Sequence, residues 1–183
     1  MSSLHLAQAI DLIHSHSSGA IVVSCSYPLA SWLDQHNTDS FLLPVVDCEN
    51  DTLALALGIA LSNPRQKVIV LQSGETMKAS LPSLVTVGYN YPKNLFHFVF
   101  NLVSEVQSPE IDFVATAQAA GYAESRQFTD LEVFASELLA FLDSEGPKFA
   151  SLNTATSAFK TQFPRFLFRD SVSSIMEELA TSG

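Results

Sequence analysis

Side chains able to do chemistry gather directly after three short apolar segments of this sequence. Residues 41–46 are followed by Asp47-Cys48-Glu49-Asn50, residues 68–71 by a turn containing Ser73-Gly74-Glu75, and residues 95–100 by Asn101. Carboxylate and amide oxygens are hard ligands of the kind that Mg²⁺ prefers. A thiol such as Cys48 becomes a nucleophile where a nearby base or cation lowers its pKa.

The segment 67–102 predicts a strand, a helix and a second strand in succession. Residues 68–71 form a β-branched apolar run typical of a strand buried on both faces of a parallel sheet. Residues 76–90 have apolar side chains at three- and four-residue steps, which indicates a helix, although Pro82 interrupts its first turn. Residues 95–100 are again apolar. Such a βαβ unit carries ligands at the carboxyl ends of its strands, where the polar groups lie.

Similar patterns predict the other elements. The helix at 52–61 is nearly all apolar, so we expect it to be buried. The helix that begins at 129 should turn five apolar residues inward, namely Leu131, Phe134, Leu138, Leu139 and Leu142. Together, the predicted helices and strands indicate one three-layer α/β/α domain over residues 1–183 with a mostly parallel sheet. Its other helices are expected at 4–16, 29–36, 111–122 and 170–179, with Asp170 as a cap, and its other strands at 20–24, 41–46 and 148–152.

Composition narrows the class of function. The chain has nine Lys and Arg against nineteen Asp and Glu, which gives a formal charge of −10. Binding to phosphate backbones needs clustered cations, so we expect no nucleic-acid partner. No apolar run is long enough to cross a bilayer, and the first residues do not resemble a secretory signal, so we expect no membrane partner and a cytoplasmic location.

The two cysteines, Cys25 and Cys48, both follow predicted strands and could line the same crevice. One interpretation is that they are small, semi-buried thiols. The other is a reactive or metal-binding thiol in a repurposed site. Asp47 and Glu49 oppose reactivity, because neighbouring carboxylates raise a thiol pKa.

Several stretches resemble a known family. They are residues 62–71, the glycine-containing turn, Leu81-Pro82-Ser83-Leu84-Val85-Thr86-Val87-Gly88 and Pro92-Lys93-Asn94-Leu95-Phe96-His97. They are similar to the diphosphate-binding (PP) domain of thiamine-diphosphate (ThDP) enzymes, in particular to the β subunit or C-terminal domain of phosphonopyruvate and sulfopyruvate decarboxylases. The resemblance covers roughly residues 10–149, whereas 155–183 diverge. It implies a ThDP-binding fold.

The cofactor-binding positions of that family are altered here. Its Gly-Asp-Gly motif, whose Asp binds the magnesium ion, corresponds to Ser73-Gly74-Glu75, so the Asp position is Gly74. The second metal ligand, an Asn, corresponds to Leu102, unless a one-residue shift lets Asn101 serve. A small Gly-Ser-Met-Gly-type turn corresponds to Asp47-Cys48-Glu49-Asn50, and residues 103–109 replace a Gly-rich cofactor loop.

The resemblance therefore implies a degenerate site and two main hypotheses. In the first, the chain has lost Mg-ThDP binding and is a non-catalytic subunit or partner in an oligomer. In the second, it is an active β subunit of a 2-oxoacid decarboxylase, a lyase, whose unorthodox metal site uses Glu75 and Asn101. A third hypothesis is new catalysis by Cys48, Glu49 and Glu75. The residues matching the family's cofactor site are Cys48, Glu49, Asn50, Ser73, Gly74, Glu75 and Asn101.

The resemblance also implies a partner, because the family's PP module works against a pyrimidine-binding (PYR) domain that this sequence lacks. Either a separate PYR-type subunit or self-association would replace it. The segment 159–169 is rich in Phe and Arg, which are enriched at interfaces. The alternative is that this segment packs on the domain's own surface.

Overall fold

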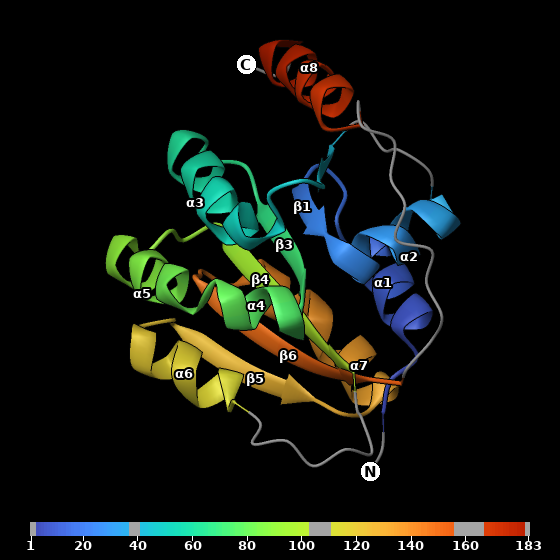
Figure 1. Ribbon diagram of the computed structural model, residues 1–183, viewed down its shortest axis with the longest axis vertical. Helices are drawn as coiled ribbons and strands as arrows, with labels where there is room; N and C mark the ends of the chain where they lie inside the picture. Colours follow the sequence, from blue (N-terminus) through green and yellow to red (C-terminus); the bar gives the residue numbers. More distant parts are fainter. Residues whose placement is uncertain (1–2, 37–40, 103–110, 156–166, 182–183) are drawn as a thin grey trace.

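The computed structural model of the protein describes residues 3–36, 41–102, 111–155 and 167–181. In these residues six strands form one all-parallel sheet with the order β2-β1-β3-β4-β6-β5 (Figure 1). The strands are β1 (Ile21–Cys25), β2 (Leu42–Val45), β3 (Val68–Ser73), β4 (Leu95–Leu102), β5 (Glu124–Phe128) and β6 (Lys148–Thr154).

Helices cover both faces of the sheet, so the predicted α/β/α fold is confirmed, with a sheet that is wholly parallel. One face packs against α1 (Leu6–Ser15), α2 (Ser26–His36) and α7 (Leu131–Asp143). The other packs against α3 (Thr52–Ser62), α4 (Gly74–Ala79), α5 (Leu81–Asn90), α6 (Phe113–Ala120) and α8 (Leu167–Thr181). A 3₁₀ turn, η1 (Glu49–Asp51), precedes α3.

Strand β4 shows how the sheet divides its side chains between two cores. Phe96, Phe98 and Phe100 pack with α1, α2 and α7, whereas Leu95 and Val99 pack with the helices of the other face. Successive side chains of a strand point to opposite faces. The same alternation sets the direction of the residues at the end of β4, which reach the candidate site.

The helix predicted at 76–90 is two helices, and this prediction is wrong in two respects. Helix α4 already begins at Gly74, where a turn was expected, and it ends at Ala79. Pro82 then lies in the first turn of α5. Proline has no N–H to donate and its ring clashes with the carbonyl four residues earlier, so one continuous helix is disfavoured there.

Strand β5 was not predicted. Its sequence, Glu-Ser-Arg-Gln-Phe, is mostly polar, and only Phe128 is fully buried. It is an edge strand that pairs with β6 alone. An edge strand covered on part of its surface needs no apolar run, so the pattern that revealed the central strands is absent.

Three predictions about helices are corrected. Leu139 is 55% exposed, and Phe141 takes an inward place beside Leu138 and Leu142. Helix α3 is buried on one face only, because it lies in an outer layer, and Leu61 is 49% exposed. Asp170 lies within the first turn of α8, which begins three residues earlier, and does not precede the helix as a cap.

None of the helices in the described part of the chain is long and apolar enough to span a membrane. The loop at 103–109 and most of the aromatic segment, including Phe159, Phe163 and Phe166, lie outside the described residues.

Candidate functional site

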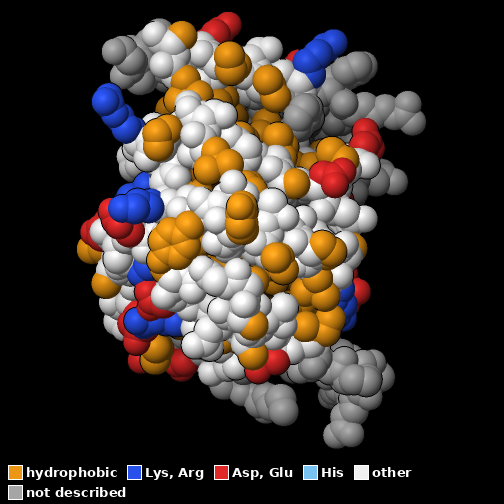
Figure 2. All heavy atoms as spheres, turned by 90° about the vertical axis from the view of Figure 1, so that its left-hand side faces the viewer, with side chains coloured by type: hydrophobic (Ala, Val, Ile, Leu, Met, Phe, Trp, Pro, Cys, Tyr) orange, Lys and Arg blue, Asp and Glu red, His pale blue; other side chains and the backbone are white. Residues whose placement is uncertain are grey.

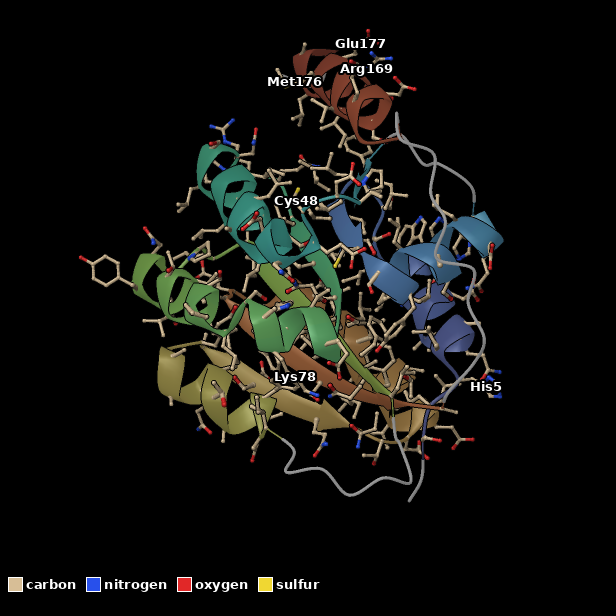
Figure 3. All side chains as sticks on the ribbon, viewed as in Figure 1. His5, Cys48, Lys78, Arg169, Met176 and Glu177 are labelled. Carbon is tan, nitrogen blue, oxygen red and sulfur yellow. The ribbon has the colours of Figure 1, made fainter. Side chains whose placement is uncertain are left out.

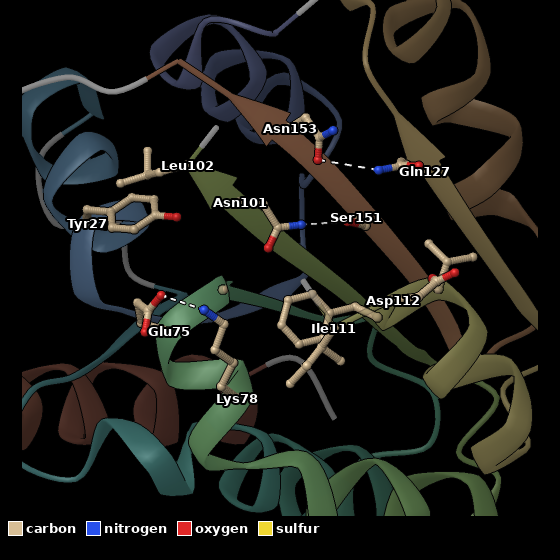
Figure 4. Close-up of a pocket in the computed structure, with 13 residues that line it drawn as sticks. Tyr27, Glu75, Lys78, Asn101, Leu102, Ile111, Asp112, Gln127, Ser151 and Asn153 are labelled. Atoms are coloured by element: carbon tan, nitrogen blue, oxygen red, sulfur yellow. Dashed lines mark hydrogen bonds and ion pairs between the residues drawn. The ribbon is translucent and has the colours of Figure 1, made fainter. Parts of the chain in front are cut away.

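A pocket of about 430 Å³ lies at the carboxyl ends of β3, β4, β5 and β6 (Figure 4). This edge of the sheet is the one at which the sequence predicts a ligand crevice. Its lining combines amides, hydroxyls and charged groups with an apolar side, and consists of Tyr27, Gly74, Glu75, Lys78, Asn101, Leu102, Ile111, Asp112, Phe113, Val114, Gln127, Ser151 and Asn153.

Gly74 and Asn101 meet at the start of α4. The Ser73 hydroxyl caps this helix by accepting a hydrogen bond from the backbone N–H of Thr76 at 3.1 Å. A β-carbon built on Gly74 would lie 2.5 Å from Oδ1 of Asn101. The Asn101 amide therefore fills the space that a side chain at position 74 would need, and its Nδ2 donates to Ser151 Oγ at 2.7 Å.

Asn101, and not Leu102, faces the start of α4. Strand alternation turns Asn101 to the face that carries α4 and turns Leu102 to the opposite face. Leu102 lies beside Tyr27 (Figure 4). The alternation of side chains along β4 thus places the Asn101 amide, and not the Leu102 side chain, next to Gly74.

Glu75 and Lys78 pair with each other at the rim of the pocket. Their side chains are 82% and 46% exposed, and Lys78 Nζ lies 2.8 Å from Glu75 Oε1 (Figure 4). Asp112 also lines the pocket, and it caps α6 by accepting from the N–H of Ala115 at 2.9 Å. Among the lining residues that the structure describes, the cation Lys78 is therefore paired with Glu75, and Asp112 adds a second carboxylate.

Tyr27 enters the site from the first turn of α2. Its hydroxyl donates to the backbone carbonyl of Phe100, and burial raises the pKa of the phenol above its usual value. Ser26, just before it, has a φ of 57°, which is uncommon for a residue other than glycine. Tyr27 is thus held as a neutral hydrogen-bond donor within the protein.

The segment 48–50 does not line the pocket, although η1 contacts α4 beside it. Glu49 accepts hydrogen bonds from the side chain and backbone of Ser26, and partial burial nevertheless raises its pKa. Cys48 and Asn50 are exposed. Figure 3 places Cys48 near the start of α3 and Lys78 well away from it. Of the predicted site residues, Gly74, Glu75 and Asn101 line the pocket, and Ser73 supports them as a cap.

The two cysteines differ in environment, and neither lines the pocket. Cys25 is buried, its thiol contacts the Leu71 carbonyl and the Thr76 hydroxyl, and burial raises its pKa to about 11. Cys48 is exposed. The interpretation as an ordinary thiol fits Cys25. Of Cys48, Glu49 and Glu75, only Glu75 lines the pocket at the ends of β3 to β6.

Sequence reasoning missed several lining residues. Tyr27 follows β1, and Ser151 and Asn153 lie near the end of β6, so the strand-end rule that selected Asn101 would have found them. Gln127 belongs to the unpredicted strand β5 and had no such signal. Its amide donates to Asn153 Oδ1 at 3.4 Å.

The residues around Gly74 do not fit a magnesium-bound diphosphate. Magnesium needs several hard oxygen ligands, and carboxylates or substrate phosphates supply most of them. Here the space holds one neutral amide oxygen, from Asn101, while Glu75 is turned to Lys78. Among the described lining residues, the cation is Lys78, and it is paired with Glu75.

Comparisons with known proteins point to one fold. No protein-family model and no curated protein sequence matches the chain. Among solved structures, it is similar to a thiamin diphosphate-dependent enzyme from Mycobacterium smegmatis, with a TM-score of 0.70 and 16% identity over 84% of this chain. The thiamine diphosphate-dependent 4-hydroxybenzoylformate decarboxylase of Rhodococcus jostii RHA1 has the same TM-score and identity over 88% of it. The chain spans about a third of those proteins, 32% and 34% of their lengths. The fold is that of ThDP-dependent enzymes.

Proposed function

We propose that this chain is a PP-type domain, of the phosphonopyruvate or sulfopyruvate decarboxylase kind, that has lost Mg-ThDP binding and serves as a non-catalytic subunit or partner in an oligomer. The ThDP-enzyme fold supports the origin of the domain. The altered residues at the carboxyl ends of its strands support the loss.

The contact between Gly74 and Asn101 carries this proposal. A metal-binding carboxylate cannot be supplied by a glycine, and the Asn101 amide already occupies the space in front of it. That amide is held by its bond to Ser151. A cation entering here would meet one neutral oxygen, so the strong charge neutralisation that a diphosphate requires is missing.

The charges of the pocket support the same conclusion. Glu75 and Asp112 outnumber Lys78 among the lining residues, and the whole chain carries a formal charge of −10. Placing a diphosphate beside these carboxylates without a metal is electrostatically unfavourable.

The alternative is an active decarboxylase subunit with an unorthodox metal site. One observation favours it: Glu75 and Asn101 both line the pocket, as that hypothesis requires. Rotation of the exposed Glu75 side chain away from Lys78 would cost little, because surface ion pairs contribute only about 0–1 kcal/mol. The two hypotheses therefore differ in whether the wild-type protein binds ThDP with magnesium.

A partner is part of either hypothesis, since the PP module of the family that the chain resembles works against a PYR-type domain. A PYR-type subunit or a second copy of this chain would complete the assembly. The partner would have to supply any catalytic group that the pocket lacks.

Calorimetric titration with ThDP and magnesium tests the proposal, with the protein alone and with any co-purifying partner. The wild type is compared with Gly74→Asp and with Gly74→Asp combined with Leu102→Asn. Because Asn101 already faces position 74, the single substitution should restore weak magnesium-dependent binding as well as the double one. The variant Leu102→Asn alone is the matched control and should not bind.

Magnesium-dependent binding of ThDP by the wild type would contradict the proposal and favour the active subunit. In that case Glu75→Gln should abolish binding. No binding by the wild type, with binding gained in Gly74→Asp, would support a decarboxylase module whose metal site has been lost.

A further inference from the structure

Four uncharged polar side chains form one group on three neighbouring strands of the pocket. They are Asn101 of β4, Ser151 and Asn153 of β6, and Gln127 of β5. Asn101 is the register partner of Asn153, and Gln127 is the register partner of Ser151. Strand alternation turns all four side chains to the face of the sheet that carries α4 and α6. We call this group the amide–hydroxyl floor of the pocket.

The amide nitrogens of the two outer strands are already bonded to side chains of β6. Asn101 Nδ2 donates to Ser151 Oγ at 2.7 Å, and Gln127 Nε2 makes a longer bond of 3.4 Å to Asn153 Oδ1 (Figure 4). In the part of the chain that the structure describes, these four side chains make no other hydrogen bond. Each therefore keeps hydrogen-bonding capacity that faces the pocket.

The remaining capacity is one acceptor on each outer strand and one donor beside it on β6. The acceptors are the amide oxygens of Asn101 and Gln127. The donors are Asn153 Nδ2 and the Ser151 hydroxyl, whose oxygen already accepts a bond from Asn101. Neighbouring strands lie about 4.8 Å apart. Asn101 with Asn153, and Gln127 with Ser151, thus form two pairs of an acceptor and a donor.

A ligand hydroxyl satisfies one such pair, because it donates its hydrogen and accepts at its oxygen. The two pairs lie two residues apart along β6, which is roughly 6.6 Å. Filling both therefore needs two hydroxyls on one frame, as on the edge of a sugar ring or a cyclic polyol. A primary amide offers its donor and acceptor at one end only, so it would fill one pair and leave the other.

The floor carries no formal charge, and this selects against charged ligands. A charged group loses hydration on entering the pocket and finds no opposite charge on the floor. At the rim, Lys78 is paired with Glu75, and Asp112 adds a second carboxylate. An anion would be repelled by these carboxylates. A neutral ligand avoids both costs.

The pocket also has an apolar side, which includes Ile111 and Val114. Ile111 is 37% exposed, so the C–H face of a ring can pack against it. Larger exposed apolar side chains lie elsewhere: Leu61, Val85 and Tyr89 belong to α3 and α5 and do not line the pocket. Figure 2 views the side of the molecule on which α3 and α5 lie in Figure 1, and hydrophobic side chains are visible across its middle. The pocket itself is mainly a polar site.

We propose that the pocket binds a neutral polyhydroxylated ligand, a sugar or a cyclic polyol, on its amide–hydroxyl floor. One hydroxyl bridges Asn101 and Asn153, a second bridges Gln127 and Ser151, and a C–H face packs against Ile111. This inference rests on the proposed function, since the pocket is available to such a ligand only where Mg-ThDP does not occupy it.

An NMR titration of the isotope-labelled wild type with D-glucose, D-galactose, D-mannose and myo-inositol tests the inference. At least one of these probes should shift the side-chain amide signals of Asn101, Gln127 and Asn153 until they saturate. The phosphate ester and the amino derivative of that probe carry a charge, and each should bind at least about tenfold more weakly.

Two variants test the floor itself. Gln127→Ala removes an acceptor, and Asn153→Asp keeps the shape and the bond from Gln127 but removes a donor. Each should weaken binding of the probe by about tenfold. Gln118→Ala is the matched control: Gln118 is an exposed glutamine of α6 that does not line the pocket, and its substitution should leave the affinity unchanged. The backbone amide spectra of the variants show that each one is folded.

The absence of a saturable shift with all four probes would overturn the inference. Equal affinity in the wild type, Gln127→Ala and Asn153→Asp would overturn it too, because the ligand would then bind elsewhere, and so would tight binding of the charged derivatives. The ThDP titration is read separately. Magnesium-dependent ThDP binding by the wild type contradicts the proposed function, whereas a protein that binds neither ThDP nor a sugar overturns this inference alone.

Discussion

Oδ1 of Asn101 lies 2.5 Å from the point that a β-carbon at position 74 would occupy, so Gly74 and Asn101 share one space at the carboxyl edge of the sheet. The atom in the way is the end of a side chain, which can rotate. Any side chain at position 74 must therefore move Asn101 and break its 2.7 Å bond to Ser151.

We therefore predict that the effects of Gly74→Ala and Asn101→Ala on stability are coupled. Gly74→Ala alone should lower the free energy of unfolding, because a buried or part-buried hydrogen bond contributes about 0.5–1.5 kcal/mol. In the Asn101→Ala background the same change should be neutral or stabilising, since alanine favours a helix. Urea unfolding of the four proteins in the cycle measures the coupling, and strict additivity would show that the two residues do not share the space.

Gly88 permits the close packing of α5 on α6. A β-carbon there would overlap the carbonyl oxygen of Ala120, and this oxygen belongs to the backbone, which cannot rotate away. Gly88→Ala should therefore lower the free energy of unfolding by about 1–3 kcal/mol, the usual cost of overpacking. Gly58→Ala, at an open helical position, is the control and should raise it by up to about 1 kcal/mol. Thermal unfolding curves compare them; equal shifts would contradict the packing.

His97 should make stability depend on pH. Its ring is fully buried between Gln72 and Tyr122, with Nε2 2.9 Å from Gln72 Oε1, and burial lowers its pKa from 6.5 to about 3. Between those two values the unfolded chain binds a proton that the folded chain does not. The contribution of neutral His97 to the free energy of unfolding is therefore fully present above pH 6.5. It is lost as the pH falls towards 3, by up to about 1.4 kcal/mol per pH unit.

The measurement is the free energy of unfolding against pH for wild type and His97→Gln. The variant removes the titrating ring, so its curve should be flatter in this window, whatever its stability at neutral pH. An unchanged slope would mean that other groups, such as carboxylates, carry the acid sensitivity.

The two cysteines should react at very different rates. Cys48 is exposed, whereas Cys25 is buried and its pKa is raised to about 11. The thiolate is the reactive form, so a thiol reagent should modify one cysteine in the folded protein and the second only after unfolding. Mass spectrometry of the wild type and Cys48→Ser assigns the site. Fast modification of Cys25 in the folded state would contradict its burial.

Much of the fold could be read from local patterns. The apolar runs at 68–71 and 95–100 predicted β3 and β4, and the helix expected at 111–122 contains α6, because buried strands and amphipathic helices leave short-range signals. Strand β5 was not predicted, because an edge strand needs few apolar residues and so lacks the pattern of a buried strand. Leu139 was misassigned because one residue of helical phase separates an inward from an outward position.

The sequence by itself determined the α/β class, the parallel central strands and the edge of the sheet at which the site lies. Those features depend on residues close together in the chain. Only the tertiary structure decided that Asn101, and not Leu102, meets Gly74, that Tyr27 and Ser151 join them, and that Cys48 and Glu49 do not. Such meetings depend on which strands are neighbours and on which face each side chain takes at the end of its strand. Both are fixed by packing between segments that the chain itself keeps far apart.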